Sequence, residues 1–205
     1  NYMVSGLVVT GLVAWGLFSA SFVVESGQVV GVTSLGATLY GSPLKWVFML
    51  APLAFILALN FGINRMSFGT LQFVFFAFAA VMGVSMATIF ANFSGESIAR
   101  VFFITAGTFA AMSIWGYTTK RDLTKMGQFL IMGLIGIIIA SLVNIFVGSS
   151  AIQFAVSVLG VVIFVGLTAY DTQRIKNDFL QFRSHGEAVG KLAIMGAVSL
   201  YLDFI

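Results

Sequence analysis

Two aspartates lie inside apolar runs in the last third of the sequence, where an ionisable side chain is unusual and indicates a function. Asp171 lies in "TAYDTQRIK" (168–176), after an apolar run that begins near Ala151, and Asp203 lies in "SLYLDFI" (199–205). An ionised carboxylate in hydrocarbon is costly unless it is paired or protonated. Two such acids can bind a cation such as Ca²⁺, which prefers oxygen ligands. They can instead share a proton and respond to pH, or activate water as in an aspartic protease.

The residues before each aspartate disfavour the protease. Intramembrane aspartic proteases carry a Gly-x-Gly-Asp stretch, whereas Leu-Tyr-Leu precedes Asp203 and Thr-Ala-Tyr precedes Asp171. We therefore predict that the protein is not an enzyme. The chain has no cysteine and a single histidine, His185, which excludes Cys-based and histidine-rich metal centres. We expect no cofactor and no tightly bound metal.

Arg65 is the third candidate residue, because it opens the third apolar run. It can be an anchor that sets the topology at the inner end of a helix. It can also form an ion pair with Asp171, because both residues are expected on the cytoplasmic side. Asp171 has a simpler alternative, since Arg174 and Lys176 follow it within about one helical turn.

The amino-acid composition indicates whether these residues lie in water or in a membrane. Hydrophobic residues make up 60% of the 205 positions and charged residues 8%, against about 25% charged residues in soluble domains. A chain so apolar cannot cover its own surface in water, so we predict an all-α integral membrane protein. The net charge of +3 does not indicate a nucleic-acid partner, because the ten basic residues lie between the apolar runs, as membrane orientation requires.

The apolar runs predict a seven-helix transmembrane bundle that forms a single domain over residues 1–205. We expect helices at about 3–24, 44–63, 70–91, 98–118, 126–148, 151–173 and 188–205. The last run offers 15 residues from Lys191 to Ile205. They make roughly 22 Å of helix, less than the roughly 30 Å hydrocarbon core. We therefore expect that the C-terminal part of the last helix is missing.

Basic residues predict the orientation, because cytoplasmic loops are enriched in lysine and arginine. With a cytoplasmic N-terminus, Lys45 and Arg100 lie outside and eight basic residues lie inside. The inner residues are Arg65, Lys120, Arg121, Lys125, Arg174, Lys176, Arg183 and Lys191. Seven spans then place the C-terminus outside. The charge of the inner connection "TTKRDLTK" (118–125) also favours anionic lipid.

The depths of the two aspartates do not match if the helices end where the apolar runs end. Counted from the flanking basic residues, Asp171 is shallow and Asp203 is deeper by about 10 Å at 1.5 Å per residue. The two can meet if the sixth helix continues past Arg174 toward Phe182, or if the seventh begins early. The pattern "IKNDFLQF" (175–182) permits this extension, and we predict it.

The same residues carry a resemblance to a known family. "AYDTQRIK" (169–176) and "AVSLYLDFI" (197–205) resemble the transmembrane Bax inhibitor motif family in its bacterial branch. "RVFFITAGTFAAMSIWGYTTKRDL" (100–123) and "FLIMGLIGIIIASLVNIF" (129–146) are similar to the middle of those proteins. The likeness covers essentially the whole chain.

The resemblance implies a bundle whose last helix is central, in the bacterial inner membrane, and a pH-sensitive leak of calcium ions through it. The paired aspartates of the family match Asp171 and Asp203, which would be both the pH sensor and the cation-binding residues. Its gating arginine looks like Arg65. The sequence departs from the family by having no glutamate between Lys45 and Arg65, which bears on the calcium entry route.

Two functions from different classes are compatible with these observations. In the first, Asp171 and Asp203 share a proton, Arg65 competes for Asp171, and protonation shifts a calcium leak channel between closed and open states. In the second, the protein transports nothing and regulates other membrane proteins, such as a quality-control protease or another membrane complex. A proton-coupled transporter is a third possibility, but no inverted repeat or broken helix supports it.

Overall fold

The computed structural model describes residues 1–25, 28–63, 65–182 and 186–205, with only the backbone for 186 and 187. The chain forms two compact units. The first comprises Asn1–Phe102 and His185–Tyr201, and the second comprises Phe103–Ser184 and Leu202–Ile205. Each unit is described by itself.

Six described helices are long and apolar enough to cross a membrane, as the first six apolar runs predict. They are α1 (Tyr2–Ser21), α3 (Leu44–Gly62), α4 (Phe68–Asn92), α5 (Gly95–Thr118), α6 (Thr124–Val147) and α7 (Ser150–Phe182). The seventh predicted helix is present as α8 (Gly186–Phe204), but α8 is not among the described helices that meet these two criteria. The count of seven spans therefore stays a prediction, and so do the central position of the last helix and its missing end.

The predicted extension of the sixth helix is confirmed. The 33 residues of α7 continue without a break past Arg174 to Phe182. At about 1.5 Å per residue, the helix is about 50 Å long and exceeds the roughly 30 Å hydrocarbon core.

The region after α1 differs from the prediction. The first helix was expected to reach residue 24, but α1 ends at Ser21 and Phe22–Glu25 forms strand β1. This strand pairs antiparallel with β2, Gln28–Val32. Both strands are rich in valine, which favours extended backbone. A short helix follows, α2 (Ser34–Tyr40), which begins where the Thr33 side chain accepts a hydrogen bond from the Gly36 amide at 3.2 Å.

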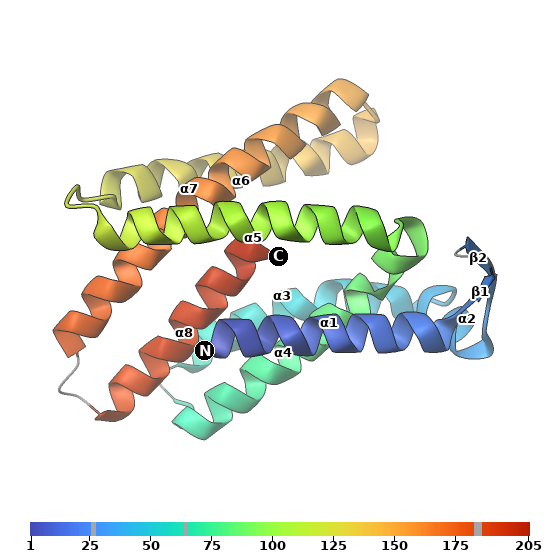
Figure 1. Cartoon of the computed structure of the whole chain (residues 1–205), viewed down its shortest axis with the longest axis horizontal. Coiled ribbons are helices and arrows are strands. Elements are labelled where there is room, and N and C mark those ends of the chain that lie inside the picture. The colour runs from blue at the N-terminus through green and yellow to red at the C-terminus, as the bar shows by residue number, and fades with distance from the viewer. Residues whose placement is uncertain (26–27, 64, 183–185) are drawn as a thin grey trace. The chain divides into compact units, whose positions relative to one another are not determined.

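The core of the first unit lies between α1 and α4, which run side by side (Figure 1). Phe75 and Phe78 of α4 are fully buried. Gly83 lets the two helices approach closely, because a Cβ at this position would lie 2.7 Å from the Thr10 carbonyl oxygen. Tyr201 of α8 is also fully buried, with edge-on contacts to both phenylalanine rings. α3 joins the core through a hydrogen bond with α4, in which the Ser85 hydroxyl of α4 donates to the Phe48 carbonyl of α3 at 2.6 Å.

The second unit contains the α6–α7 hairpin, whose two arms lie side by side (Figure 1). Its turn depends on Gly148, which has a positive φ of 66° and so adopts a left-handed conformation that favours glycine. Asn144 stabilises the turn by accepting a hydrogen bond from the Ser149 amide at 2.9 Å. Gly166 of α7 leaves room for the Leu130 side chain of α6, because a Cβ on Gly166 would lie 2.5 Å from that side chain.

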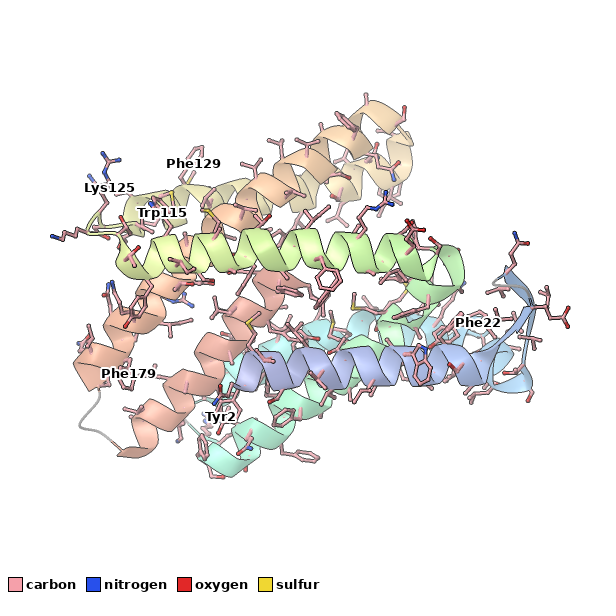
Figure 2. The ribbon with its side chains drawn as sticks, viewed as in Figure 1. Tyr2, Phe22, Trp115, Lys125, Phe129 and Phe179 are labelled. Carbon is pink, nitrogen blue, oxygen red and sulfur yellow. The ribbon has the colours of Figure 1, made fainter. Side chains whose placement is uncertain are left out.

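The outer surface of α6 is apolar, as a lipid-facing helix requires. Phe129, Ile145 and Phe146 are 74%, 75% and 90% exposed. Figure 2 shows Phe129 projecting away from the ribbon. Exposed aromatic and branched side chains in this density are not compatible with a water-facing surface.

Candidate functional site

The most enclosed part of the second unit is the segment of α7 that carries Asp171. Ala169 is fully buried, and Asp171 and Gln173 are 8% and 7% exposed. Glycines on two neighbouring helices permit this packing. A Cβ on Gly116 of α5 would collide with the Ala169 carbonyl oxygen, and a Cβ on Gly127 of α6 would lie 2.5 Å from the Tyr170 ring. Three helices therefore approach one another where the acid lies.

Asp171 pairs with a basic residue on its own helix. Its Oδ1 atom lies 3.1 Å from Nη2 of Arg174, three residues along. The Arg174 guanidinium also lies over the Tyr170 ring, 5.7 Å from its centre. Of the two partners expected from helical spacing, Arg174 is therefore confirmed. Lys176 instead donates to the Tyr117 carbonyl at 2.7 Å, at the end of α5.

Asp203 belongs to the same unit as Asp171, although most of α8 belongs to the other unit. Asp171 and Arg174 are both close enough to interact electrostatically with its carboxyl group. Its Oδ2 atom is buried and has no hydrogen-bond partner within the described part of the chain. Phe204, the next residue, packs its ring edge-on against Phe109 of α5, with ring centres 5.4 Å apart. The structure thus brings the two predicted aspartates together in the second unit.

Arg65 lies in the connection between α3 and α4, with an exposed side chain. Its backbone N–H donates to the Gly62 carbonyl at 2.9 Å, and its side chain is in neither of the two ion pairs found among the described residues. It belongs to the first unit, so its pairing with Asp171 stays a prediction. Arg183 and His185, which also figured in the sequence analysis, lie outside the described residues.

Two further polar groups were not expected from the sequence. Ser113 Oγ of α5 and Thr172 Oγ1 of α7 are buried, and neither has a hydrogen-bond partner among the residues described. Ser113 shares a helix face with Phe109, which contacts Phe204, and with Gly116, which contacts Ala169. It therefore lies between the contacts that α5 makes with the end of α8 and with α7. No sequence signal singles out Ser113, because the contacts of Phe109 and Gly116 on either side of it are known only from the structure.

Gln173 is another residue that the sequence did not single out. Its Oε1 atom accepts a hydrogen bond from the Leu123 amide at 2.9 Å, and its Nε2 atom donates to the Arg121 carbonyl at 2.8 Å. The side chain thus satisfies a backbone donor and a backbone acceptor in the connection between α5 and α6. The connection is fixed to α7 two residues beyond Asp171.

No group of three or more histidine, cysteine, aspartate or glutamate residues that could hold a metal occurs within the described ranges. Asp171 and Asp203 supply two carboxyl groups, whereas Ca²⁺ usually takes six to eight oxygen ligands. Water molecules would have to supply the other ligands of a bound ion.

The apolar helices and the enclosed acids define an integral membrane protein with ionisable groups between its helices. The chain belongs to the Bax inhibitor family, since residues 1–205 match the family described as inhibitor of apoptosis-promoting Bax1. It is 40% identical to the inner membrane protein YbhL of Escherichia coli, over all of this chain and 83% of that protein. It is 42% identical to a protein of Rickettsia prowazekii and 39% to one of Caulobacter vibrioides, over all of this chain and 81% of each relative. The resemblance noted from the sequence is therefore confirmed, and the apolar helices together with the similarity to the inner membrane protein YbhL support a place in the inner membrane.

Proposed function

We propose that the protein is a leak pathway for Ca²⁺ across the inner membrane, controlled by a proton that Asp171 and Asp203 share. The observation that supports this proposal is the pair of enclosed carboxyl groups within electrostatic range of each other, together with the unpartnered Oδ2 atom of Asp203. Enclosed acids of this kind in a membrane protein usually serve ion or proton movement.

The charges around the pair give the proposal a mechanism. Two close carboxylates resist double ionisation, so one proton is shared while Arg174 neutralises the remaining negative charge. Loss of that proton leaves one negative charge in excess, which a passing cation can neutralise. Proton number therefore sets the affinity of the site for a cation, and it biases the protein between a closed and an open state.

Arg65 has a separate part in the proposal as the gate residue on the cytoplasmic side. A gate that depends on its positive charge predicts that Arg65→Ala raises the basal Ca²⁺ flux, while Arg65→Lys keeps it low. If Arg65 is only a topology anchor, neither substitution changes the flux of correctly inserted protein.

The proposal is tested by Ca²⁺ flux into dye-loaded proteoliposomes between about pH 5 and pH 8, because a proton shared by two acids would make the flux depend on pH. Wild type, Asp171→Asn and Asp203→Asn are compared. Asp178→Asn is the matched control, because Asp178 is on the same helix but not in the ion pairs of the described chain. We expect a pH-dependent flux in wild type and the control, and a flat pH profile in the other two variants.

Two outcomes contradict the proposal in different ways. A flux with unchanged pH dependence in both aspartate variants removes the aspartate switch but keeps the leak. Folded protein without flux at any pH favours the non-transporting regulator. Purification from native membranes would then show whether a protease or another membrane complex accompanies it.

A further inference from the structure

The connection between α5 and α6 and the first turn of α6 expose three basic side chains that the proposed leak mechanism does not use. Lys120, Arg121 and Lys125 are all exposed, and we call them the basic patch. None of the three is in the ion pairs found in the described part of the chain. Figure 2 shows Lys125 projecting outward where α5 leads into α6.

Side chains of α7 hold the backbone that carries the basic patch through hydrogen bonds. Gln173 binds both the Arg121 carbonyl and the Leu123 amide, as described above. Lys176 braces the preceding end of α5 through the Tyr117 carbonyl, and its ammonium group lies 5.3 Å from the centre of the Tyr117 ring. A preorganised backbone reduces the entropy that the patch loses when it binds a partner.

Asp122, the only acid in this connection, leaves the basic patch with a net positive charge. Asp122 accepts hydrogen bonds from the Thr124 hydroxyl at 2.6 Å and the Thr124 amide at 2.9 Å. The hydrogen bond from the Thr124 side chain is the main reason why the pKa of Asp122 is lowered, followed by the bond from the backbone. Asp122 therefore keeps its charge near neutral pH, and three basic groups oppose one acid. Lys176 and Arg174 of α7 add positive charge nearby, and Arg174 is paired with Asp171.

The surroundings of the patch indicate the kind of partner. Trp115 and Tyr117, in the last two turns of α5, are 42% and 61% exposed, and Phe129, one turn beyond Lys125 on α6, is 74% exposed. Figure 2 places Trp115 and Lys125 at the same end of these helices. Exposed aromatic rings beside basic residues are typical of the boundary between lipid tails and head groups.

We propose that the basic patch is a binding site for the head group of an anionic phospholipid. The phosphate would contact Lys120, Arg121 and Lys125, while the tails lie along the apolar surface that includes Phe129. Because Gln173 and Lys176 tie this connection to α7 beside Asp171, bound anionic lipid would also alter the Ca²⁺ leak. This regulatory part rests on the proposed function, whereas the binding site does not.

Trp115 provides a direct test of binding. Substitution of the exposed Trp15 and Trp46 by phenylalanine leaves Trp115 as the sole tryptophan, since the chain has three. The full chain is reconstituted in phosphatidylcholine vesicles that contain either brominated phosphatidylglycerol or brominated phosphatidylcholine at equal amounts. Bromine quenches tryptophan fluorescence at contact. We expect stronger quenching by the anionic lipid, with a preference that falls about fivefold for each patch residue changed to glutamine.

Lys45 provides the control for the binding test, because it lies in α3, outside the basic patch. Lys45→Gln removes an exposed basic residue elsewhere and should leave the preference unchanged. Equal quenching by the two lipids overturns the site, and a preference that survives Lys120→Gln/Arg121→Gln/Lys125→Gln overturns its location. Loss of the preference when phosphate replaces chloride at constant ionic strength shows a site for free phosphate and also overturns the proposal.

A Ca²⁺ flux measurement in the same vesicles tests the regulatory part. We expect wild-type flux to differ between vesicles with and without phosphatidylglycerol, and the glutamine variants to lose this difference. Lipid binding without any effect on a measurable flux overturns the regulation alone. Lipid binding without flux in any vesicle overturns the regulation together with the proposed leak and leaves the binding site in place.

Discussion

Tyr201 donates a hydrogen bond to Thr10 across 2.6 Å and so joins α8 to α1 within the first unit. The Thr10 hydroxyl has one hydrogen, which is shared between the carbonyl oxygens of Ala79 at 2.8 Å and Gly6 at 3.0 Å. Thr10 is therefore the acceptor and Tyr201 the donor in the bond between them. One buried hydroxyl group connects α8, α1 and α4.

Tyr201→Phe should lower the free energy of unfolding in detergent micelles by about 0.5–1.5 kcal/mol, the usual contribution of one hydrogen bond. The ring contacts with Phe75 and Phe78 would remain. Tyr2→Phe is the control, because Tyr2 makes a ring contact with Phe68 and no hydroxyl bond is found for it among the described residues. Equal effects of the two substitutions would show that the bond contributes nothing specific.

Gly116→Ala should destabilise the second unit by about 1–3 kcal/mol, because the new methyl group would lie 2.8 Å from the Ala169 Cα atom and meet backbone that cannot rotate away. Gly107→Ala, on the same helix, has no neighbour within 4 Å and should be neutral or stabilising by up to about 1 kcal/mol. Thermal unfolding monitored by circular dichroism measures both changes. A Gly116→Ala variant as stable as wild type would contradict the close approach of α5 and α7.

Gln173→Ala should cost about 1–3 kcal/mol, since it leaves the amide of the buried Leu123 without its partner. Asn177→Ala removes an exposed amide side chain one turn further along α7 and should change little. Hydrogen exchange gives a more local measurement. The Leu123 amide should exchange faster in Gln173→Ala and at the wild-type rate in Asn177→Ala, and unchanged exchange in both would contradict the described bond.

Ser113→Ala and Thr172→Val test whether the unpartnered hydroxyls serve the cation rather than the fold. An apolar replacement of a buried group that lacks a hydrogen bond should leave stability unchanged or raise it. If these hydroxyls contact a passing ion, the Ca²⁺ flux should nevertheless fall. Ser157→Ala is the control, because the Ser157 hydroxyl donates to the Gln153 carbonyl on its own helix. Loss of stability without loss of flux would assign the two hydroxyls a structural role.

The sequence predicts the helices of this protein well because a membrane-spanning helix needs a long apolar run. The mismatch in depth between Asp171 and Asp203 even predicts the length of α7, since only a longer helix or an earlier start of the last one can bring the acids together. The β1–β2 hairpin was missed because its valines also suit the end of an apolar helix. Pairing between strands, which decides the outcome, depends on residues further along the chain.

The candidate site was only partly predictable for a similar reason. Acids in apolar runs are conspicuous, and the Asp171–Arg174 pair follows from helical spacing. Ser113 and Thr172 are not conspicuous, because hydroxyls in helices usually bond to their own backbone, as Thr168 does with Phe164 at 2.9 Å. The partner of Gln173 lies 50 residues away, which no local pattern indicates.

Because α7 is long, a small tilt around Asp171 would produce a larger displacement near the C-terminal end of the helix. Phe179 lies eight residues beyond Asp171, or about 12 Å along the axis, and its side chain is 54% exposed (Figure 2). A tilt of about 10° around Asp171 would therefore move Phe179 by about 2 Å. The chain has no cysteine of its own, so Phe179→Cys would carry a spectroscopic label at one site. A rearrangement around the acid, too small to see at Asp171 itself, would be magnified at this outer position.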